Sequence, residues 1–358
     1  MENQVFNILV LGASYGALLA TKLILAGHNA KLICTREEVE LINSRGTIVR
    51  IPITKNGKSI EINSATAKGN LSAEIPQNAD PEQYDLVILA MQEPQYSLPE
   101  IRELLSKIGK SKIPCISIMN MPPPPFLTRL KSIDMASIEN CYTDVSVWHH
   151  LSEDLMTNCS PDPQAFRPEG ELANVLQVRL PTNFKCAAFN DDSANVILRS
   201  IEKDIDSTTI VLSDGSKSKV PVKLRVFDSV FIPLAKWPML ITGNYRCILD
   251  TTVQSIKDAV HDDLTISEEL YSWVEKLCAR LGSTDLDMVP FQKYADAALS
   301  LTTPSSPARA LLGGAVNVER ADRLIRKIAA NHGQRHPTLD LIVERVDQWL
   351  ARNRNKHT

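Results

Sequence analysis

Residues 6–36 read FNILVLGASYGALLATKLILAGHNAKLICTR, and this stretch decides the fold of the N-terminal part of the chain. The apolar run Phe6–Leu11 predicts a buried β-strand, and the leucine spacing within Tyr15–Ala26 predicts a helix that Gly27 ends. Ala30–Cys34 predicts the next strand. A strand, a helix and a strand within about 30 residues form a βαβ unit, and such crossovers build parallel sheets.

The rest of the chain divides into a second sheet-forming stretch and a helical stretch. Tyr84–Ala90 and Ile113–Met119 predict further buried strands, the pair Asn56-Gly57 predicts a hairpin turn, and Pro122–Pro125 are expected to halt regular structure. With 358 residues, about two domains are expected. We therefore predict an α/β protein with a Rossmann-type parallel-sheet domain over residues 1–220 and an all-helical domain over residues 221–358.

Helical patterns follow residue 221. Leu224 to Leu249 form one long apolar segment, and Thr265 with Glu268 predicts a capping box ahead of a helix that reaches Leu281. Further helices are expected over Asn317–Asn331 and Thr338–Ala351. The last one is amphipathic, and its apolar face is expected to pack on its own core or on a second subunit of a homodimer.

Composition excludes several classes of protein. The 39 basic and 42 acidic residues leave a net charge of −3 without a basic block, so no nucleic-acid partner is expected. The seven cysteines are scattered without a C-x-x-C pair, so neither a disulfide framework nor a metal site is expected. No apolar run is long enough to span a membrane and no signal-peptide profile is present, so we expect a cytoplasmic protein.

The turn between the first strand and the first helix predicts a nucleotide site. Its residues are Gly12, Ala13, Ser14, Tyr15, Gly16 and Ala17. Such a turn aims backbone N–H groups and a helix N-terminus at the pyrophosphate of a dinucleotide. Ser14 stands where the backbone usually approaches the phosphates through glycine. The alternative is an ordinary βα turn built of small residues.

Arg36, just after the second strand, favours NADPH as the cofactor. An arginine at this position can pair with the 2′-phosphate of NADP, whereas an acidic residue would bind the ribose hydroxyls of NAD. Glu37 and Glu38 follow directly, and either is an alternative ribose ligand. A solvated surface arginine is the third interpretation.

Lys236 interrupts an apolar stretch and is the candidate catalytic residue. In an uninterrupted α-helix, Lys236, Leu240 and Asn244 would share one face at i, i+4 and i+8, with the lysine and the asparagine roughly 12 Å apart along the axis. A lysine in such a place either extends to water or takes part in chemistry.

These features together resemble the ketopantoate reductase family, over nearly the whole chain and with weak identity. The resemblance implies that Lys236 is the catalytic lysine and that Asn244 and Ser305 bind the substrate. It also implies that Arg36 binds the NADP phosphate and that Asn120 borders the nicotinamide. His332-Gly333 and Pro337 match the family's His-Gly and nearby proline.

The chain departs from this family at several positions. The first substrate asparagine of the family is Leu240 here, and the lysine beside the cofactor phosphate is Gln92. The family's glutamate falls on Asn317, although Glu319 lies two residues away. These departures imply a conserved cofactor site and an altered substrate pocket.

The resemblance thus implies an NADPH-dependent oxidoreductase that reduces a small 2-oxo acid or a related ketone, with Lys236 stabilising the oxyanion and donating the proton. Two alternatives stay open. One is an opine-type dehydrogenase, which reduces an imine formed from an amine and a 2-oxo acid. The other is a catalytically silent NADP-binding protein.

Overall fold

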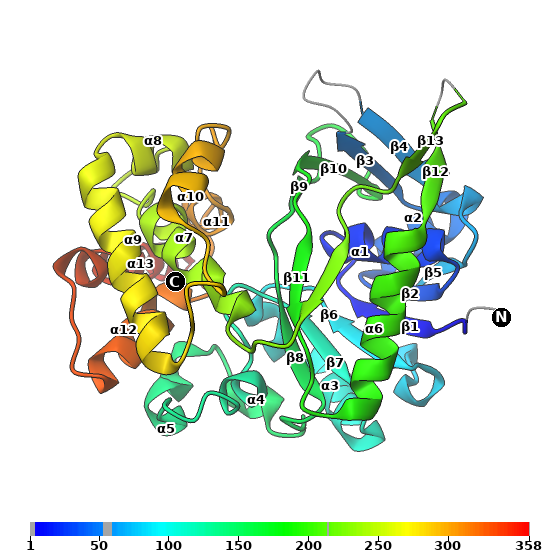
Figure 1. Cartoon of the computed structure of the whole chain (residues 1–358), viewed down its shortest axis with the longest axis horizontal. Helices are drawn as coiled ribbons and strands as arrows, with labels where there is room; N and C mark the ends of the chain where they lie inside the picture. The colour runs from blue at the N-terminus through cyan, green and yellow to red at the C-terminus, as the bar shows by residue number, and fades with distance from the viewer. Residues whose placement is uncertain (1–3, 53–58, 213–214, 358) are drawn as a thin grey trace. The chain divides into compact units, whose positions relative to one another are not determined.

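The computed structural model of the chain describes residues 4–52, 59–212 and 215–357. It divides into two compact units (Figure 1). Unit 1 comprises Met1–Met91, Gln95–Phe126 and Ser146–Asp228, and unit 2 comprises Gln92–Pro94, Leu127–Val145 and Ser229–Thr358. Each unit is described by itself below. Whether residues 1–220 and 221–358 fold as independent domains stays a prediction.

Unit 1 is built on a mostly parallel sheet of eight strands in the order β14-β11-β8-β7-β6-β1-β2-β5. In chain order the strands are β1 Asn7–Leu11, β2 Asn29–Ile33, β5 Leu71–Glu74, β6 Leu86–Leu89, β7 Cys115–Ile118, β8 Met156–Ser160, β11 Phe184–Ala187 and β14 Leu224–Phe227. All neighbours are parallel except β8 and β11. The chain leaves β1 toward β2 on one side and returns with β6 on the other, which makes the gap between β1 and β6 the topological switch point.

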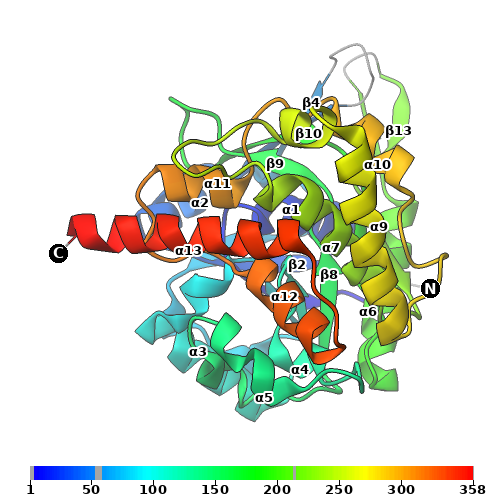
Figure 2. The same ribbon diagram turned by 90° about the vertical axis from the view of Figure 1, so that its left-hand side faces the viewer.

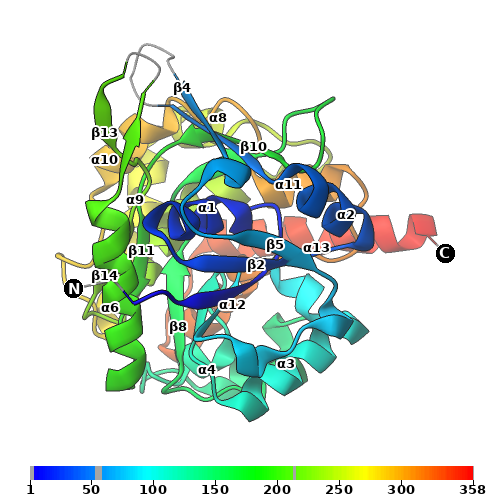
Figure 3. The ribbon, with the colours of Figure 1, turned by 90° about the vertical axis from the view of Figure 1, so that its right-hand side faces the viewer.

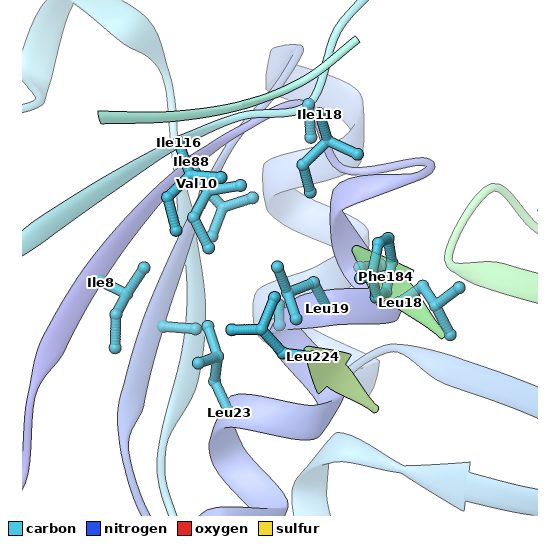
Figure 4. Packing of buried hydrophobic residues seen from close by; sticks show 14 of the residues in the cluster. Ile8, Val10, Leu18, Leu19, Leu23, Ile88, Ile116, Ile118, Phe184 and Leu224 are labelled. Carbon is cyan, nitrogen blue, oxygen red and sulfur yellow. The ribbon is translucent and has the colours of Figure 1, made fainter. Parts of the chain in front are cut away.

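The helices of unit 1 cover both faces of this sheet (Figure 3). They are α1 Gly16–Ala26, α2 Arg36–Arg45, α3 Pro99–Ser111 and α6 Asp192–Ser207. The apolar residues of α1 and α6 join Ile8, Val10, Ile88 and Ile116 in one core cluster (Figure 4). Because strand side chains alternate between faces, the neighbouring residues of the strands point to the other face, which explains why β6 and residues 8–11 of β1 are apolar throughout. The Rossmann-type fold expected from residues 6–36 is confirmed.

Two smaller sheets complete unit 1. The first has the order β4-β3-β10-β9, with β3 Ile48–Pro52, β4 Ser59–Asn63, β9 Gln164–Phe166 and β10 Val175–Leu180. The second pairs β12 Thr209–Val211 with β13 Lys217–Lys219. Strands β3 and β4 pair antiparallel as the hairpin prediction requires, but the predicted turn residues Asn56 and Gly57 lie outside the described residues.

Unit 2 is helical. Its helices are α5 Met135–Ile138, α7 Lys236–Met239, α8 Ile256–His261, α9 Leu264–Leu281, α10 Phe291–Ala298, α11 Ser306–Leu312, α12 Ala321–Asn331 and α13 Pro337–His357. Helices α9, α12 and α13 are the long elements seen in Figure 2. One apolar face of α13, with Leu339, Ile342 and Val346, is buried and packs on the chain's own core, whereas Leu341 is exposed. In the described part of the chain, no helix combines the length and apolar character that a membrane crossing requires.

Three sequence-based boundaries are corrected by the structure. Leu224–Phe227 forms β14 at the edge of the large sheet, so the region after residue 221 does not begin as a helix. Asp263, not Thr265, caps α9, because its carboxylate accepts a hydrogen bond from the backbone N–H of Ile266 at 3.0 Å. The proline run does not halt regular structure completely, since a short helix, α4 Pro124–Leu127, begins within it.

The helix expected over Asn317–Asn331 begins only at Ala321. The preceding residues are held by side chains instead of helical hydrogen bonds. The Arg320 guanidinium pairs with the Asp322 carboxylate through two bonds of 2.9 Å, and the Tyr245 hydroxyl donates to the Glu319 carbonyl oxygen at 2.5 Å. These contacts fix an irregular turn ahead of α12.

Lys22 is an unusual member of the unit 1 core. Its side chain lies on α1 and is 1% exposed, and within the described residues its ammonium nitrogen has no hydrogen-bond partner. Burial lowers the pKa of Lys22 to about 7, because removal from water penalises the charged form. The unfolded chain therefore binds a proton that the folded chain has released between about pH 7 and the ordinary pKa of lysine.

Lys22→Met should stabilise the protein by about 2 kcal/mol at pH 7, because it removes the cost of burying an unpaired ammonium group. The advantage of the variant should shrink as the pH rises toward 10, since the unfolded lysine also loses its proton there. Urea unfolding across this pH range measures both effects. The exposed Lys107→Met on α3 is the matched control, and equal stability for Lys22→Met and wild type at every pH would show that the ammonium group reaches water.

Candidate functional site

The turn after β1 depends on Gly12 and Gly16. Gly12 has φ of +107°, a conformation that favours glycine, and a Cβ there would lie 2.9 Å from the Ala90 carbonyl oxygen. A Cβ on Gly16 would lie 2.7 Å from Cγ1 of Val10. Gly16 therefore allows the close packing of helix against strand, and the chain turns sharply enough to bring the start of α1 over the end of β1.

The start of α1 carries unsatisfied backbone donors. Tyr15 is the N-cap residue and its side chain makes no capping bond. Within the described residues, the backbone N–H groups of Ser14, Tyr15 and Gly16 have no protein acceptor, while Ser14 is exposed. A helix N-terminus of this kind concentrates positive potential and presents donors to an anion. The turn can therefore hold a pyrophosphate.

Tyr15 fixes this turn from the side. Its hydroxyl donates to the Pro163 carbonyl oxygen at 2.6 Å, and its ring meets the edge of the Phe184 ring at 5.9 Å between centroids. Burial raises the pKa of Tyr15 well above its ordinary value, so the hydroxyl stays protonated as a donor. The predicted turn residue Tyr15 thus acts as an anchor through its side chain.

The chain after β2 forms a capping box. The Thr35 hydroxyl accepts from the Glu38 N–H, and the Glu38 carboxylate accepts from the Thr35 N–H at 3.2 Å. The other oxygen of Glu38 accepts from Arg167 at 2.5 Å. Arg36 is exposed at the first position of α2. Both oxygens of Glu38 therefore already have protein partners, which disfavours Glu38 as a ribose ligand. Arg36, in contrast, faces solvent.

Two further sequence-predicted residues follow strands of the same sheet. Asn120 comes two residues after the end of β7 and is half-buried, and Gln92 comes three residues after β6 and is exposed. Because β1, β2, β6 and β7 run parallel, the residues that follow them lie at one edge of the sheet. The structure thus brings Gly12–Ala17, Arg36 and Asn120 to the edge where open α/β sheets bind ligands.

Lys236 lies in a continuous helical segment of unit 2 that changes its winding. A 3₁₀ turn, η7 Ile232–Ala235, leads into α7, and a π-helix, η8 Leu240–Tyr245, follows. Lys236 is half-buried, and Leu240 is fully buried. A π-helical turn contains one residue more than an α-helical turn, which rotates the following residues around the helix axis. Lys236, Leu240 and Asn244 therefore do not share one face, as an uninterrupted α-helix would require.

Tyr294 accounts for the π-turn. Its hydroxyl donates to the Met239 carbonyl oxygen at 3.1 Å, at the point where the π-helix begins. A Cβ on Gly243 would lie only 2.1 Å from this hydroxyl, so only glycine fits there. A side chain inserted beside the helix backbone is a known cause of such irregular turns. Gly243 and Tyr294 together shape the π-helix in which Asn244 lies.

Asn244 and Ser305 are connected through the backbone. The Ser305 hydroxyl donates to the Asn244 carbonyl oxygen at 2.5 Å, and it accepts from the Ala308 N–H as the N-cap of α11. The Cys247 thiol also donates to the same carbonyl at 3.2 Å. Ser305 is 3% exposed. The Ser305 hydroxyl therefore holds the backbone carbonyl of Asn244 in place. The side-chain amide of Asn244 is half-buried and has no hydrogen-bond partner among the described residues.

Asn317 and Glu319 occupy different environments. Asn317 is exposed, and its side-chain oxygen accepts from Arg354 of α13 at 3.2 Å. Glu319 is buried, and its carbonyl oxygen receives the Tyr245 hydroxyl from the end of the π-helix. A carboxylate near the π-helix is thus supplied by Glu319, while Asn317 lies on the surface beside α13. The predicted substrate role of Asn317 stays a prediction.

Glu93 is a candidate residue that the sequence reasoning missed. It is 2% exposed, and its carboxylate accepts from the Thr143 N–H at 2.9 Å and from the Thr143 hydroxyl at 2.8 Å. Burial raises the pKa of Glu93 to about 7, the hydrogen bonds from Thr143 act in the opposite direction, and the charges of Glu319 and Asp144 add smaller increases. The only sequence signal was an acidic residue three positions beyond a predicted strand. Unit 2 therefore contains a buried acid that can exchange a proton near neutral pH.

Gly243→Ala should destabilise the protein by about 2 kcal/mol, because the new methyl group overlaps the Tyr294 hydroxyl. Tyr294→Phe alone should cost about 1 kcal/mol through its lost hydrogen bond. In the double variant the methyl group enters the space that the hydroxyl leaves, so the two costs should not add. Urea unfolding of the four proteins tests this, and strictly additive costs would separate Gly243 from Tyr294.

The comparisons with known proteins find similarity in structure alone. Neither a scan against models of protein families nor a search of curated protein sequences finds a match. Among solved structures, a protein from Ralstonia solanacearum MolK2 assigned as a ketopantoate reductase is similar with a TM-score of 0.67 and 13% identity, covering 98% of this chain and 99% of the other.

Two further solved structures share this arrangement. A ketopantoate reductase from Ralstonia eutropha JMP134 is similar with a TM-score of 0.62 and 13% identity, covering 97% of this chain and 99% of that one. A ketopantoate reductase from Staphylococcus aureus, described as dimeric, has a TM-score of 0.57 and 10% identity, with coverage of 97% and 99%. Over nearly its whole length, the chain therefore has the fold of these ketopantoate reductases, as the sequence resemblance implied.

Proposed function

We propose that the chain is an NADPH-dependent oxidoreductase that reduces a small 2-oxo acid or a related ketone by hydride transfer. The observation that carries this proposal is the uncapped start of α1 beside the switch point, with three backbone donors free for a pyrophosphate. An ordinary βα turn would normally satisfy these donors with a capping side chain. The fold shared with ketopantoate reductases supports the same conclusion.

The residues of unit 1 would bind and orient the cofactor. The N–H groups of Ser14, Tyr15 and Gly16 would hold the pyrophosphate, and Arg36 would pair with the 2′-phosphate. Asn120 would border the nicotinamide at the same edge, and the cofactor role of Gln92, which belongs to unit 2, stays a prediction. NADPH, when bound, supplies the hydride that adds to the carbonyl carbon of the substrate.

The residues of unit 2 would act on the substrate. Lys236 would stabilise the negative charge that develops on the carbonyl oxygen, and its ammonium group would donate the proton that completes the alcohol. The free amide of Asn244 would orient the substrate, and Ser305 would hold Asn244 in place through its backbone carbonyl. Leu240 contributes an apolar side chain where the family has an asparagine, so the pocket would favour a less polar substrate than ketopantoate.

Lys236→Ala should lower kcat for NADPH oxidation with a 2-oxo acid by at least about a hundredfold, since it removes the proton donor. The dissociation constant for NADPH, measured by its fluorescence, should stay unchanged. Lys276→Ala, which removes an exposed lysine of α9, is the matched control. Unchanged turnover in Lys236→Ala would exclude this lysine from the mechanism. A requirement for added amino acid in the wild type would instead identify an imine as the substrate.

Ser14→Glu should weaken NADPH binding at least about tenfold, because it places a carboxylate at the proposed pyrophosphate position. An acidic side chain at a helix start is otherwise stabilising, so the melting temperature should not fall. Fluorescence titration and thermal unfolding measure the two effects. Ser300→Glu carries the same charge change on an exposed serine of unit 2 and should bind as the wild type does. Undiminished binding by Ser14→Glu would place the nucleotide elsewhere.

A further inference from the structure

A short segment of unit 1 connects the starts of two helices. At one end, the Pro163 carbonyl oxygen accepts from the Tyr15 hydroxyl, directly before the first turn of α1. At the other end, the Arg167 guanidinium donates to the Glu38 carboxylate in the first turn of α2. Strand β9 lies between these two contacts. Residues 163–167 therefore run from the turn after β1 to the turn after β2.

Residues 163–167 lie along the sheet edge at which a Rossmann-type fold binds a dinucleotide. Strands β1 and β2 are parallel neighbours, so the turns that follow them lie side by side. In a Rossmann-type fold the adenosine half of the cofactor extends from the first turn to the second. Residues 163–167 span the same two points, and Arg167 reaches the end where the ribose of adenosine is expected.

Arg167 has hydrogen-bonding capacity to spare. Its one contact among the described residues is with Glu38, through Nη2 at 2.5 Å. A guanidinium carries five N–H donors in a planar fork that matches a phosphate group. The contact with Glu38 places the guanidinium beside the first turn of α2, which follows β2.

The Glu38 carboxylate pairs with Arg167 and is also fixed by a hydrogen bond from the Thr35 N–H. One carboxylate oxygen accepts from the Thr35 N–H and the other pairs with the guanidinium, so each oxygen already has a protein partner. Arg36 is exposed at the adjacent position, with nothing to cover it in the described part of unit 1. Two guanidinium groups therefore stand next to the start of α2, one solvated and one paired with a carboxylate.

We propose that Arg167 is a specificity-determining residue that binds the 2′-phosphate of NADPH together with Arg36. The phosphate would take the donors of Arg167 that Glu38 leaves unused, and the Glu38 carboxylate would compete with the phosphate for the guanidinium. This inference rests on the proposed function, because it presumes that a nucleotide binds at this edge of the sheet. It assigns a cofactor contact to the segment between β8 and β10, outside the turns after β1 and β2.

Binding of 2′,5′-ADP and 5′-ADP to the full-length protein, measured by calorimetry, tests the proposal without turnover. Arg167→Ala should weaken 2′,5′-ADP at least about tenfold, the usual loss for hydrogen bonds to a charged group, and should leave 5′-ADP unchanged. Glu38→Gln keeps a capping box, because glutamine can serve at that position, but it removes the competing charge. This variant should bind 2′,5′-ADP more tightly than the wild type.

The controls separate this inference from the proposed function. Arg50→Ala removes an arginine of β3 that pairs with Glu61 and Glu171, and it should bind both probes as the wild type does. Equal weakening of both probes in Arg167→Ala, or no weakening of either, would overturn the role of Arg167. If the wild-type protein bound neither probe, the proposed function itself would fail.

Discussion

The close approach of helix α1 to the end of strand β1 is the constraint on which the rest of unit 1 depends. Gly12 and Gly16 leave no room for a Cβ, so the helix begins directly over the strand end. No side chain then caps the helix, and its first N–H groups face outward. The same geometry provides close packing of helix on strand and a local site for an anion, which is why the proposed cofactor position follows from the fold.

Unit 2 contains a second constraint, centred on the end of the π-helix. The Tyr245 hydroxyl donates to the Glu319 carbonyl oxygen and accepts from the Ala321 N–H, which joins the segment that carries Lys236 to the start of α12. Buried carboxyl groups of Glu93 and Glu319 lie near this connection. The π-helix that follows Lys236 is thus held at both ends by tyrosine hydroxyls, Tyr294 at Met239 and Tyr245 at α12.

Local patterns in the sequence predicted the elements that local forces determine. The βαβ unit over residues 6–36, the buried strands and the amphipathic α13 could be read from periodicity and from glycine at helix ends. The π-helix could not, because its cause is Tyr294, which is distant in sequence. Strand β14 was also missed, since its four residues sit inside a longer apolar run without a turn signal.

In the candidate site, too, the sequence predicted what local spacing determines and missed what distant contacts determine. Spacing placed Arg36 and Asn120 at the edge of the sheet where the parallel strands end, because each comes within three residues of a strand end, and their cofactor roles stay predictions. Counting along the sequence could not distinguish Asn317 from Glu319, since burial rather than position separates them. Arg167 and Glu93 were missed because their partners, Glu38 and Thr143, come from other parts of the chain.

The pairing of β3 with β10 has a consequence for how the chain assembles during synthesis. Ile48 lies opposite Val175, so β3 leaves the ribosome long before its parallel neighbour exists. Until β10 follows, the nascent protein presents a sheet edge whose N–H and C=O groups can pair with another chain. A polypeptide truncated before residue 175 would keep that edge open, and such a fragment would be prone to aggregation.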